Sequence, residues 1–224
     1  MRPGRIKKNS VSPWKEVTSK TPVRNIWSLE PGECIVAEEI LNHLKDVEVY
    51  FPIHDVGVDL LIVEGKKHVG LQVKESRYYI GRKWKSGHVG HSWQQIKRIK
   101  FDQGKGKIDF YVFLTYLPIE GEHKVSTFGY KFLVVPSDEV EKRLAVKDAG
   151  KKNIFSFCFH FQDRNVWDER VRATLDDSRT DYSQFLNAWE QIDKFLQWAI
   201  KKGFWYHLAR AAMLPSGKTV VSNE

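Results

Sequence analysis

The segment GVDLLIVEGKKHVGLQVKESR, residues 57 to 77, constrains the fold more than any other part of the chain. Two strand-like apolar runs, Val58 to Val63 and His68 to Lys74, flank the turn-like sequence EGKK. The segment therefore predicts a β-hairpin. Three polar residues interrupt these runs at positions where a core strand would favour Val or Ile. They are Asp59, Gln72 and Lys74.

The register of this hairpin decides whether the three polar side chains meet. If the turn is centred between Gly65 and Lys66, Asp59 pairs with Gln72 on one side of the sheet, with β-carbons about 5 Å apart. Lys74 lies two residues further on and shares that side. The other face then carries the apolar residues Leu60, Ile62, Leu71 and Val73. A slip of one residue would reverse every side chain, so the convergence depends on this register.

The segment PGECIVAEEILNHLKD, which begins at Pro31, predicts a helix. Its apolar face consists of Val36, Ala37, Ile40 and Leu44. Glu33 falls on that face by helical spacing, whereas Glu38 and Glu39 fall to its sides. We therefore expect Glu33 to face the packed side of the helix.

A buried acid is costly unless it is paired, so Glu33 needs a partner. A divalent cation held by Glu33, Asp59 and Gln72 would supply one. Oxygen donors with no His or Cys at ligand spacing favour Mg²⁺ or Mn²⁺ over zinc.

The rest of the chain predicts one mixed β-sheet flanked by helices, an α/β fold. Residues 1–25 are expected to form a basic flexible arm, 26–203 the folded domain and 204–224 a tail. Within 92–101, SWQQIKRIKF predicts a helix with Ser92 and Gln95 as a capping box. The other predicted strands are 47–52, 107–118, 127–136 and 154–161, and the other predicted helices are 137–147 and 182–200.

The charge is unevenly distributed along the chain. The net charge is +8 and the isoelectric point about 9.3. Basic residues cluster in residues 1–25 and again between Lys74 and Lys107. This segregation predicts a polyanion partner, because phosphate contacts dominate nucleic-acid affinity; a solvated basic surface is the alternative. The candidate phosphate contacts are Arg77, Arg82, Lys83, Lys85, Lys97 and Lys100.

Two further observations bear on the compartment. No apolar run approaches the ~18 residues of a membrane span, and the N-terminal residues lack the apolar stretch of a secretory signal. Cys34 and Cys158 show no metal-ligand spacing and do not form a disulfide framework. We therefore expect a reduced, cytoplasmic protein without a membrane partner.

The pattern of these residues resembles that of the PD-(D/E)xK nuclease superfamily. It consists of the helix acid, the Asp before the first hairpin strand and the Gln-x-Lys of the second. This superfamily includes restriction endonucleases and Holliday-junction resolvases. Its pattern is a helix acid, an Asp opening the second strand and [E/Q]-x-K on the third. Glu33, Asp59, Gln72 and Lys74 match these positions. The resemblance covers residues 31 to 77, and less distinctly continues to Leu117.

The resemblance implies a restriction endonuclease-like fold and Mg²⁺-dependent or Mn²⁺-dependent hydrolysis of DNA. Glu33, Asp59, the Gln72 amide oxygen and the Val73 carbonyl would hold the metal, and Lys74 would orient the attacking water. Gln72 stands where most members have Glu. This removes one negative charge, which implies a weaker site or a single metal. Cutting of both DNA strands would favour a homodimer.

Several side chains keep two interpretations. Lys74 alone is explained by a salt bridge to Asp59, and Asp55 is a second candidate acid, more simply a loop residue beside His54. His88 and His91 either contact phosphate or face solvent. Trp84 and Trp93 either stack on bases or pack, and packing is the simpler expectation for Trp93 on a helix.

Three functions are compatible with these residues. The first is a DNA endonuclease of restriction, defence or junction-resolving type. The second is a nucleic-acid-binding protein without catalysis on the same fold, which Gln72 alone favours. The third is an RNA-processing nuclease, because a basic surface does not distinguish DNA from RNA.

Overall fold

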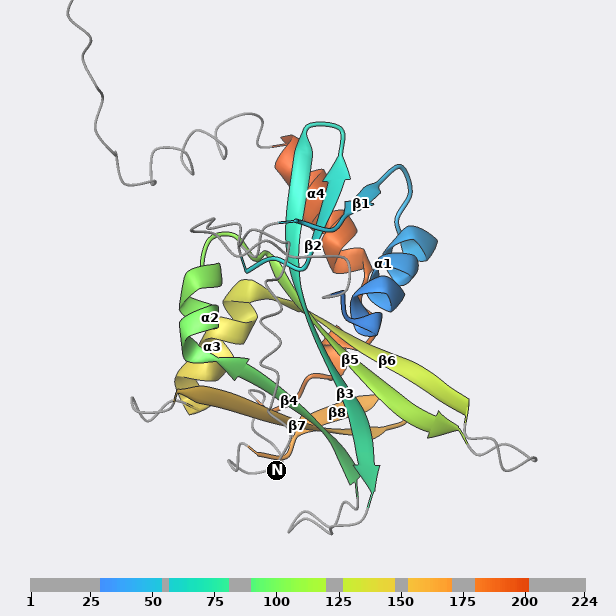
Figure 1. The fold of residues 1–224 in the computed structure, drawn as a ribbon, viewed down its shortest axis with the longest axis vertical. Helices are drawn as coiled ribbons and strands as arrows, with labels where there is room; N and C mark the ends of the chain where they lie inside the picture. The colour runs from blue at the N-terminus through green and yellow to red at the C-terminus, as the bar shows by residue number, and fades with distance from the viewer. Residues whose placement is uncertain are drawn as a thin grey trace, which may run out of the picture.

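The structure is a computed structural model that describes residues 29–53, 57–80, 90–119, 127–147, 153–170 and 180–201. The predicted arm and tail therefore lie outside the described residues. In chain order the elements (Figure 1) are α1 (Pro31–His43), β1 (Glu48–Tyr50), β2 (Leu60–Glu64), β3 (Lys67–Ile80), β4 (Gly90–Lys97), α2 (Arg98–Gly104), β5 (Phe110–Ile119), β6 (Thr127–Pro136), α3 (Ser137–Lys147), β7 (Ile154–Gln162), β8 (Asn165–Asp168), a 3₁₀ turn (Ser183–Phe185) and α4 (Glu190–Lys201).

The predicted hairpin and its register are confirmed. β2 pairs antiparallel with β3, and Leu60 lies opposite Leu71. Gly65 at the turn has φ +59°, a left-handed conformation that glycine adopts without steric cost. Leu60, Ile62 and Leu71 are buried on one face of the sheet. The polar residues therefore fall on the other face.

Strand β3 belongs to two parts of one eight-stranded sheet. Its first part pairs with β2 and, in parallel, with β5, while its last three residues pair with β4. We call β1-β2-β3-β5-β6 the first half-sheet and β3-β4-β7-β8 the second half-sheet. Among the described strands, all pairs except β3 with β5 are antiparallel. The predicted α/β class with a mixed sheet is thus confirmed at this level.

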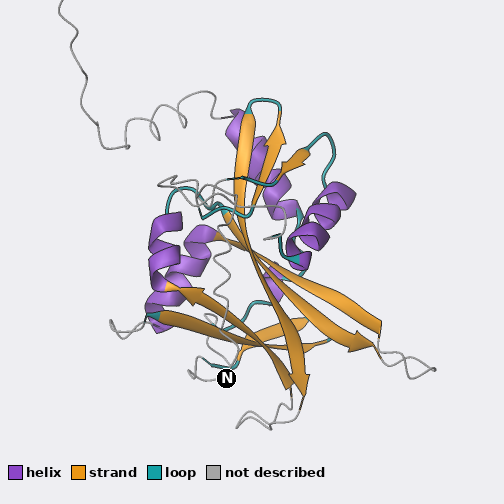
Figure 2. Cartoon of the chain, viewed as in Figure 1, coloured by secondary structure: helices purple, strands orange, loops and turns teal. Residues whose placement is uncertain are grey.

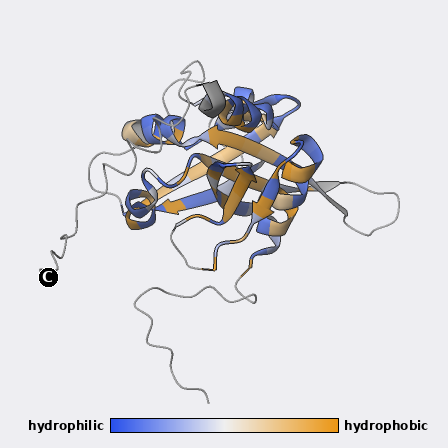
Figure 3. Ribbon diagram, turned by 90° about the horizontal axis from the view of Figure 1, so that it is seen from above, coloured by the Kyte–Doolittle hydropathy of each residue, from blue (hydrophilic) through white to orange (hydrophobic). Residues whose placement is uncertain are grey.

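The first half-sheet is covered on both faces. Helices α1 and α4 pack on one face, where Figures 1 and 2 show them together, around Val36, Ile40, Trp189 and Ile192. The second half-sheet, with α2 and α3, covers the other face. Because β5 and β6 are buried on both faces, they read as continuous apolar runs. Figure 3 shows these apolar strands enclosed by more polar helices.

The helix predicted at residues 92–101 is wrong. Residues 92–97 belong to β4, and only 98–101 are helical, because the helix α2 begins at Arg98. Burial alternates along β4, with Ser92, Gln94 and Ile96 inward. The Gln94 side-chain amide is stabilised inside because it donates to the Leu114 carbonyl at 2.9 Å. Trp93 consequently points outward with 44% of its surface exposed, so its predicted packing on a helix is also wrong.

The helix predicted at residues 182–200 starts later than expected. Residues 183–185 form a 3₁₀ turn, Asn187 has φ +51°, and α4 begins at Glu190. The apolar stripe of this segment is still core, because Tyr182, Phe185, Trp189, Ile192 and Leu196 are buried.

Two further observations concern membrane-spanning helices and the state of the cysteines. None of the described helices is long and apolar enough to cross a membrane. Cys34 is exposed, Cys158 is buried, and both are free thiols.

Candidate functional site

Asp59 directly precedes β2 and extends its pairing with β3. Gly57, with φ +86°, turns the chain into the strand. The Asp59 N–H then donates to the Leu71 carbonyl at 2.8 Å, and its carboxylate Oδ2 accepts the Val73 N–H at 2.8 Å. The carboxylate is therefore held beside the backbone of β3.

The Gln72 side chain meets Asp59 as the register predicts. Its Nε2 donates to Asp59 Oδ2 and lies 3.4 Å from the Val73 carbonyl oxygen. A carboxylate oxygen and a backbone carbonyl oxygen thus face one donor. A half-turn of the Gln72 amide would present its own oxygen at the same place, because the two ends of a primary amide have nearly the same shape.

Asp59, Gln72 and Lys74 line one cavity of about 410 Å³, which we call the hairpin cavity. Lys97 at the end of β4 and Lys100 in α2 line the same cavity, so two of the predicted phosphate contacts lie beside the three polar residues. The remaining lining residues are Glu30, Gly57, Gln95, Ile96, Phe101 and Tyr111.

Lys74 is half-buried in this cavity. No hydrogen bond or ion pair joins its Nζ to another residue in the part of the chain that the structure describes. The simplest structural explanation for Lys74, a salt bridge to Asp59, is therefore not formed.

The phase of α1 is as predicted. Glu33 is 4% exposed and shares the packed face with Val36, Ala37 and Ile40, whereas Glu38 is exposed. The helix packs on the sheet face formed by the apolar residues of the hairpin. Glu33 does not line the hairpin cavity.

A different acid at the start of α1 does line the cavity. It is Glu30, the N-cap residue that precedes the helix. Sequence reasoning did not select Glu30, because it precedes the periodic apolar residues from which the packed face was identified. Its position immediately before Pro31, a helix-starting residue, is the signal that marks it.

The oxygen donors at the cavity fit a hydrated divalent cation. Among the described residues no three or more His, Cys, Asp or Glu side chains gather closely enough to form a metal site on their own. Asp59 nevertheless brings a carboxylate, Gln72 an amide and Val73 a carbonyl, with Glu30 on the same cavity wall. Mg²⁺ keeps several waters and binds proteins through one or two carboxylates together with substrate phosphates. The Asp59 carboxylate, the Gln72 amide and the Val73 carbonyl match this mode of Mg²⁺ binding.

Tyr111 and Gln95 also line the cavity but were not predicted. Tyr111 lies beside Gln72 because β5 pairs in parallel with β3. Burial, and secondly the charge of Asp59, raise the pKa of Tyr111, so its phenol stays protonated as a possible donor. Neither position is evident from sequence. Tyr111 reaches the cavity through the pairing of β5 with β3, and Gln95 reaches it because β4 is a strand.

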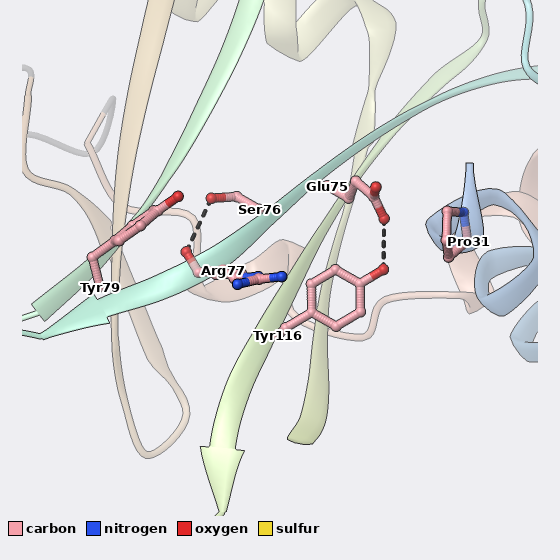
Figure 4. A pocket seen from close by; sticks show the side chains of 6 residues that line it. All are labelled: Pro31, Glu75, Ser76, Arg77, Tyr79 and Tyr116. Carbon is pink, nitrogen blue, oxygen red and sulfur yellow. Dashed lines mark hydrogen bonds between the residues drawn. The ribbon is translucent and has the colours of Figure 1, made fainter. Parts of the chain in front are cut away.

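The remaining predicted contacts lie apart from the cavity or outside the described residues. Arg77 is exposed on β3 and lines a different cavity (Figure 4). His91 is half-buried, and burial lowers its pKa, so its ring carries little charge at neutral pH. The candidates that fall outside the described residues are His54, Asp55, Arg82, Lys83, Trp84, Lys85 and His88.

Comparisons of the chain with protein-family models, curated proteins and solved structures give no match.

Proposed function

We propose that this protein is a metal-dependent nuclease that hydrolyses phosphodiester bonds in DNA at the hairpin cavity. The observation that carries the proposal is the convergence of Asp59, Gln72 and Lys74 in a cavity whose wall also holds Lys97 and Lys100. Acidic and amide oxygens suit a cation, and three lysines suit the phosphates of a polyanion.

The order of elements supports the same proposal. Asp59 opens the second strand and Gln72-x-Lys74 lies on the third, which is the arrangement of the PD-(D/E)xK pattern. The helix α1 that precedes them carries Glu33 in its first turn and has Glu30 as its N-cap residue. A restriction endonuclease-like fold is therefore part of the proposal. A restriction, defence or junction-resolving role is compatible with it, and cutting of both strands would favour a homodimer.

The chain's own residues have distinct roles in this proposal. Asp59, the Gln72 amide oxygen and the Val73 carbonyl would hold Mg²⁺ or Mn²⁺. The acid added by α1 would be Glu33, as the resemblance implies, or Glu30, which lines the cavity. When bound, such an ion supplies a water of lowered pKa and polarises the phosphate. Lys74 holds the attacking water in place and stabilises negative charge on the phosphoryl oxygens. Lys97 and Lys100 bind neighbouring phosphates.

The direct test is incubation of the purified protein with supercoiled plasmid, a four-way junction and structured RNA, each with Mg²⁺, Mn²⁺ or EDTA. We expect cleavage of DNA with either metal and none with EDTA. Cleavage of RNA alone would replace the DNA assignment with an RNA-processing one. Absence of cleavage of all three substrates with both metals would contradict the proposal.

A binding protein without catalysis is the second candidate, and one observation favours it. The Asp59 carboxylate already accepts hydrogen bonds from Gln72 and from the Val73 N–H, so it is satisfied without a cation. Gln72→Glu distinguishes the two candidates. In a nuclease it should strengthen metal binding and preserve or increase cleavage. In a binding protein the second carboxylate would repel Asp59 and the phosphates, and affinity for DNA would fall.

The basic wall of the cavity makes a separate prediction. Replacing Lys97 and Lys100 together with alanine should weaken DNA binding and reduce the slope of log K against log salt by about 2, because each lost phosphate contact releases fewer counterions. Binding is measured by fluorescence anisotropy over a salt series. Lys45→Ala with Lys66→Ala is the matched control, since both lysines are exposed and neither lines the cavity. An unchanged slope in the Lys97 and Lys100 variant would remove this wall from the interface.

A further inference from the structure

Exposed aromatic side chains follow the outer face of β3 and β4 beside the hairpin cavity. Tyr79 is 52% exposed and Trp93 44% exposed. Tyr79 pairs across the strands with His91, whose ring lies 6.2 Å from Tyr79 and 6.4 Å from Trp93 between centroids. The three rings thus form a continuous strip, which we call the aromatic strip.

The aromatic strip is connected to the candidate site by adjoining cavities. A second cavity of about 410 Å³ is lined by Lys74 and Gln95, which also line the hairpin cavity, and by Tyr79 and Trp93. A third cavity of about 710 Å³ extends from Tyr79 to Arg77 and Tyr116 (Figure 4). Lys74 therefore stands where the candidate site meets the strip.

Basic side chains lie along the strip, and the charge of one acid, Glu169, acts on its middle ring, His91. Lys74 and Arg77 lie along it, and the Arg170 guanidinium is 5.4 Å from the Trp93 ring centroid. The acid in these cavities is Glu75, whose carboxylate accepts a hydrogen bond from Tyr116 Oη at 2.5 Å (Figure 4). Burial and this hydrogen bond raise the pKa of Tyr116, so the phenol stays protonated and keeps donating to Glu75.

Exposed rings beside a basic groove are the features by which proteins hold unpaired nucleotides. Bases stack on aromatic side chains, and Lys and Arg follow the phosphates. A base inside a duplex is already stacked on its neighbours, so its faces are closed to a protein ring. The strip therefore fits single-stranded rather than duplex nucleic acid.

We infer that the aromatic strip binds an unpaired stretch of the DNA substrate, with bases stacked on Trp93 and Tyr79 and the adjoining phosphate at Lys74. This inference rests on the proposed function for the position of the phosphate. The substrate is accordingly DNA with a single-stranded segment, such as a flap, a frayed end or the branch of a junction.

The test is a binding experiment in EDTA, so that it does not depend on cleavage. Fluorescein-labelled oligo(dT) and a blunt duplex are titrated with wild type, Trp93→Ala, Tyr79→Ala and Trp93→Phe. We expect wild type to prefer oligo(dT). Each alanine substitution should weaken oligo(dT) binding roughly tenfold, while Trp93→Phe recovers most of the affinity. Binding of the blunt duplex should change by less than about twofold, because it depends on phosphate contacts.

Tyr50→Ala is the matched control, because Tyr50 is 49% exposed but lies on β1, away from these cavities. Wild-type preference for the duplex, an equal loss for both probes, or no loss in either alanine variant would overturn the inference. Failure of the proposed nuclease function gives a different result. Wild type then shows no metal-dependent cleavage, but the alanine variants still lose oligo(dT) binding.

Discussion

Lys74→Ala should abolish cleavage while leaving DNA binding nearly unchanged. The variant removes one ammonium group that faces the hairpin cavity and has no partner among the described residues. Removal of one group that stabilises charge in the transition state typically slows an enzyme by about 10²–10³-fold. The other basic residues remain, so DNA binding should lose no more than one phosphate contact, which lowers the slope of log K against log salt by about 1. Single-turnover cleavage and anisotropy in EDTA measure the two effects.

A matched variant separates loss of the Lys74 role from loss of a lysine in general. Lys131 is half-buried on β6 and lines none of the cavities described above. Lys131→Ala should therefore cleave at the wild-type rate. If Lys74→Ala cuts as fast as wild type, the catalytic residues lie elsewhere on the chain.

Glu33→Gln should reduce metal-dependent cleavage by orders of magnitude. Glu33 is buried on the packed face of α1, and a buried carboxylate that carries charge requires compensation. The proposal assigns part of that compensation to the metal, so removing the charge should weaken metal binding. Cleavage rates over a Mg²⁺ titration measure the effect, and thermal unfolding of each variant shows that it is folded.

Three neighbouring acids complete this experiment. Glu38→Gln and Glu39→Gln should change little, because these residues lie at the sides of the helix. Glu30→Gln is the decisive comparison, since Glu30 lines the hairpin cavity and Glu33 does not. If Glu30→Gln loses cleavage and Glu33→Gln keeps it, the helix acid is the N-cap residue and the assignment of Glu33 is wrong.

The hairpin and its register could be predicted because every local signal agrees. The turn between Gly65 and Lys66 fixes the pairing, and the side-chain period of two then places Asp59 beside Gln72. The phase of α1 was equally accessible, since its apolar residues repeat at helical spacing. Both predictions concern contacts between residues that are close together in the sequence.

The cavity walls could not be predicted because they depend on pairing between distant segments. In β4 the polar residues Ser92 and Gln94 are buried, and Gln94 is compensated by the carbonyl of Leu114 on β5. Sequence shows the polar residues but not their distant partner, so a helix capped by Ser92 and Gln95 was the simpler interpretation. The same holds for Tyr111, which reaches the cavity only through the parallel pairing of β5 with β3.

Because β3 carries both Lys74 and Tyr79, the proposed cutting position and the proposed base anchor are on one continuous strand. The five-residue separation corresponds to roughly 16 Å along an extended chain. This distance is set by the backbone and does not depend on the DNA sequence. A nuclease organised in this way would act as a molecular ruler, with each cut at a constant number of nucleotides from the anchored base. Its products would share one offset from the junction between paired and unpaired DNA, whatever bases flank it.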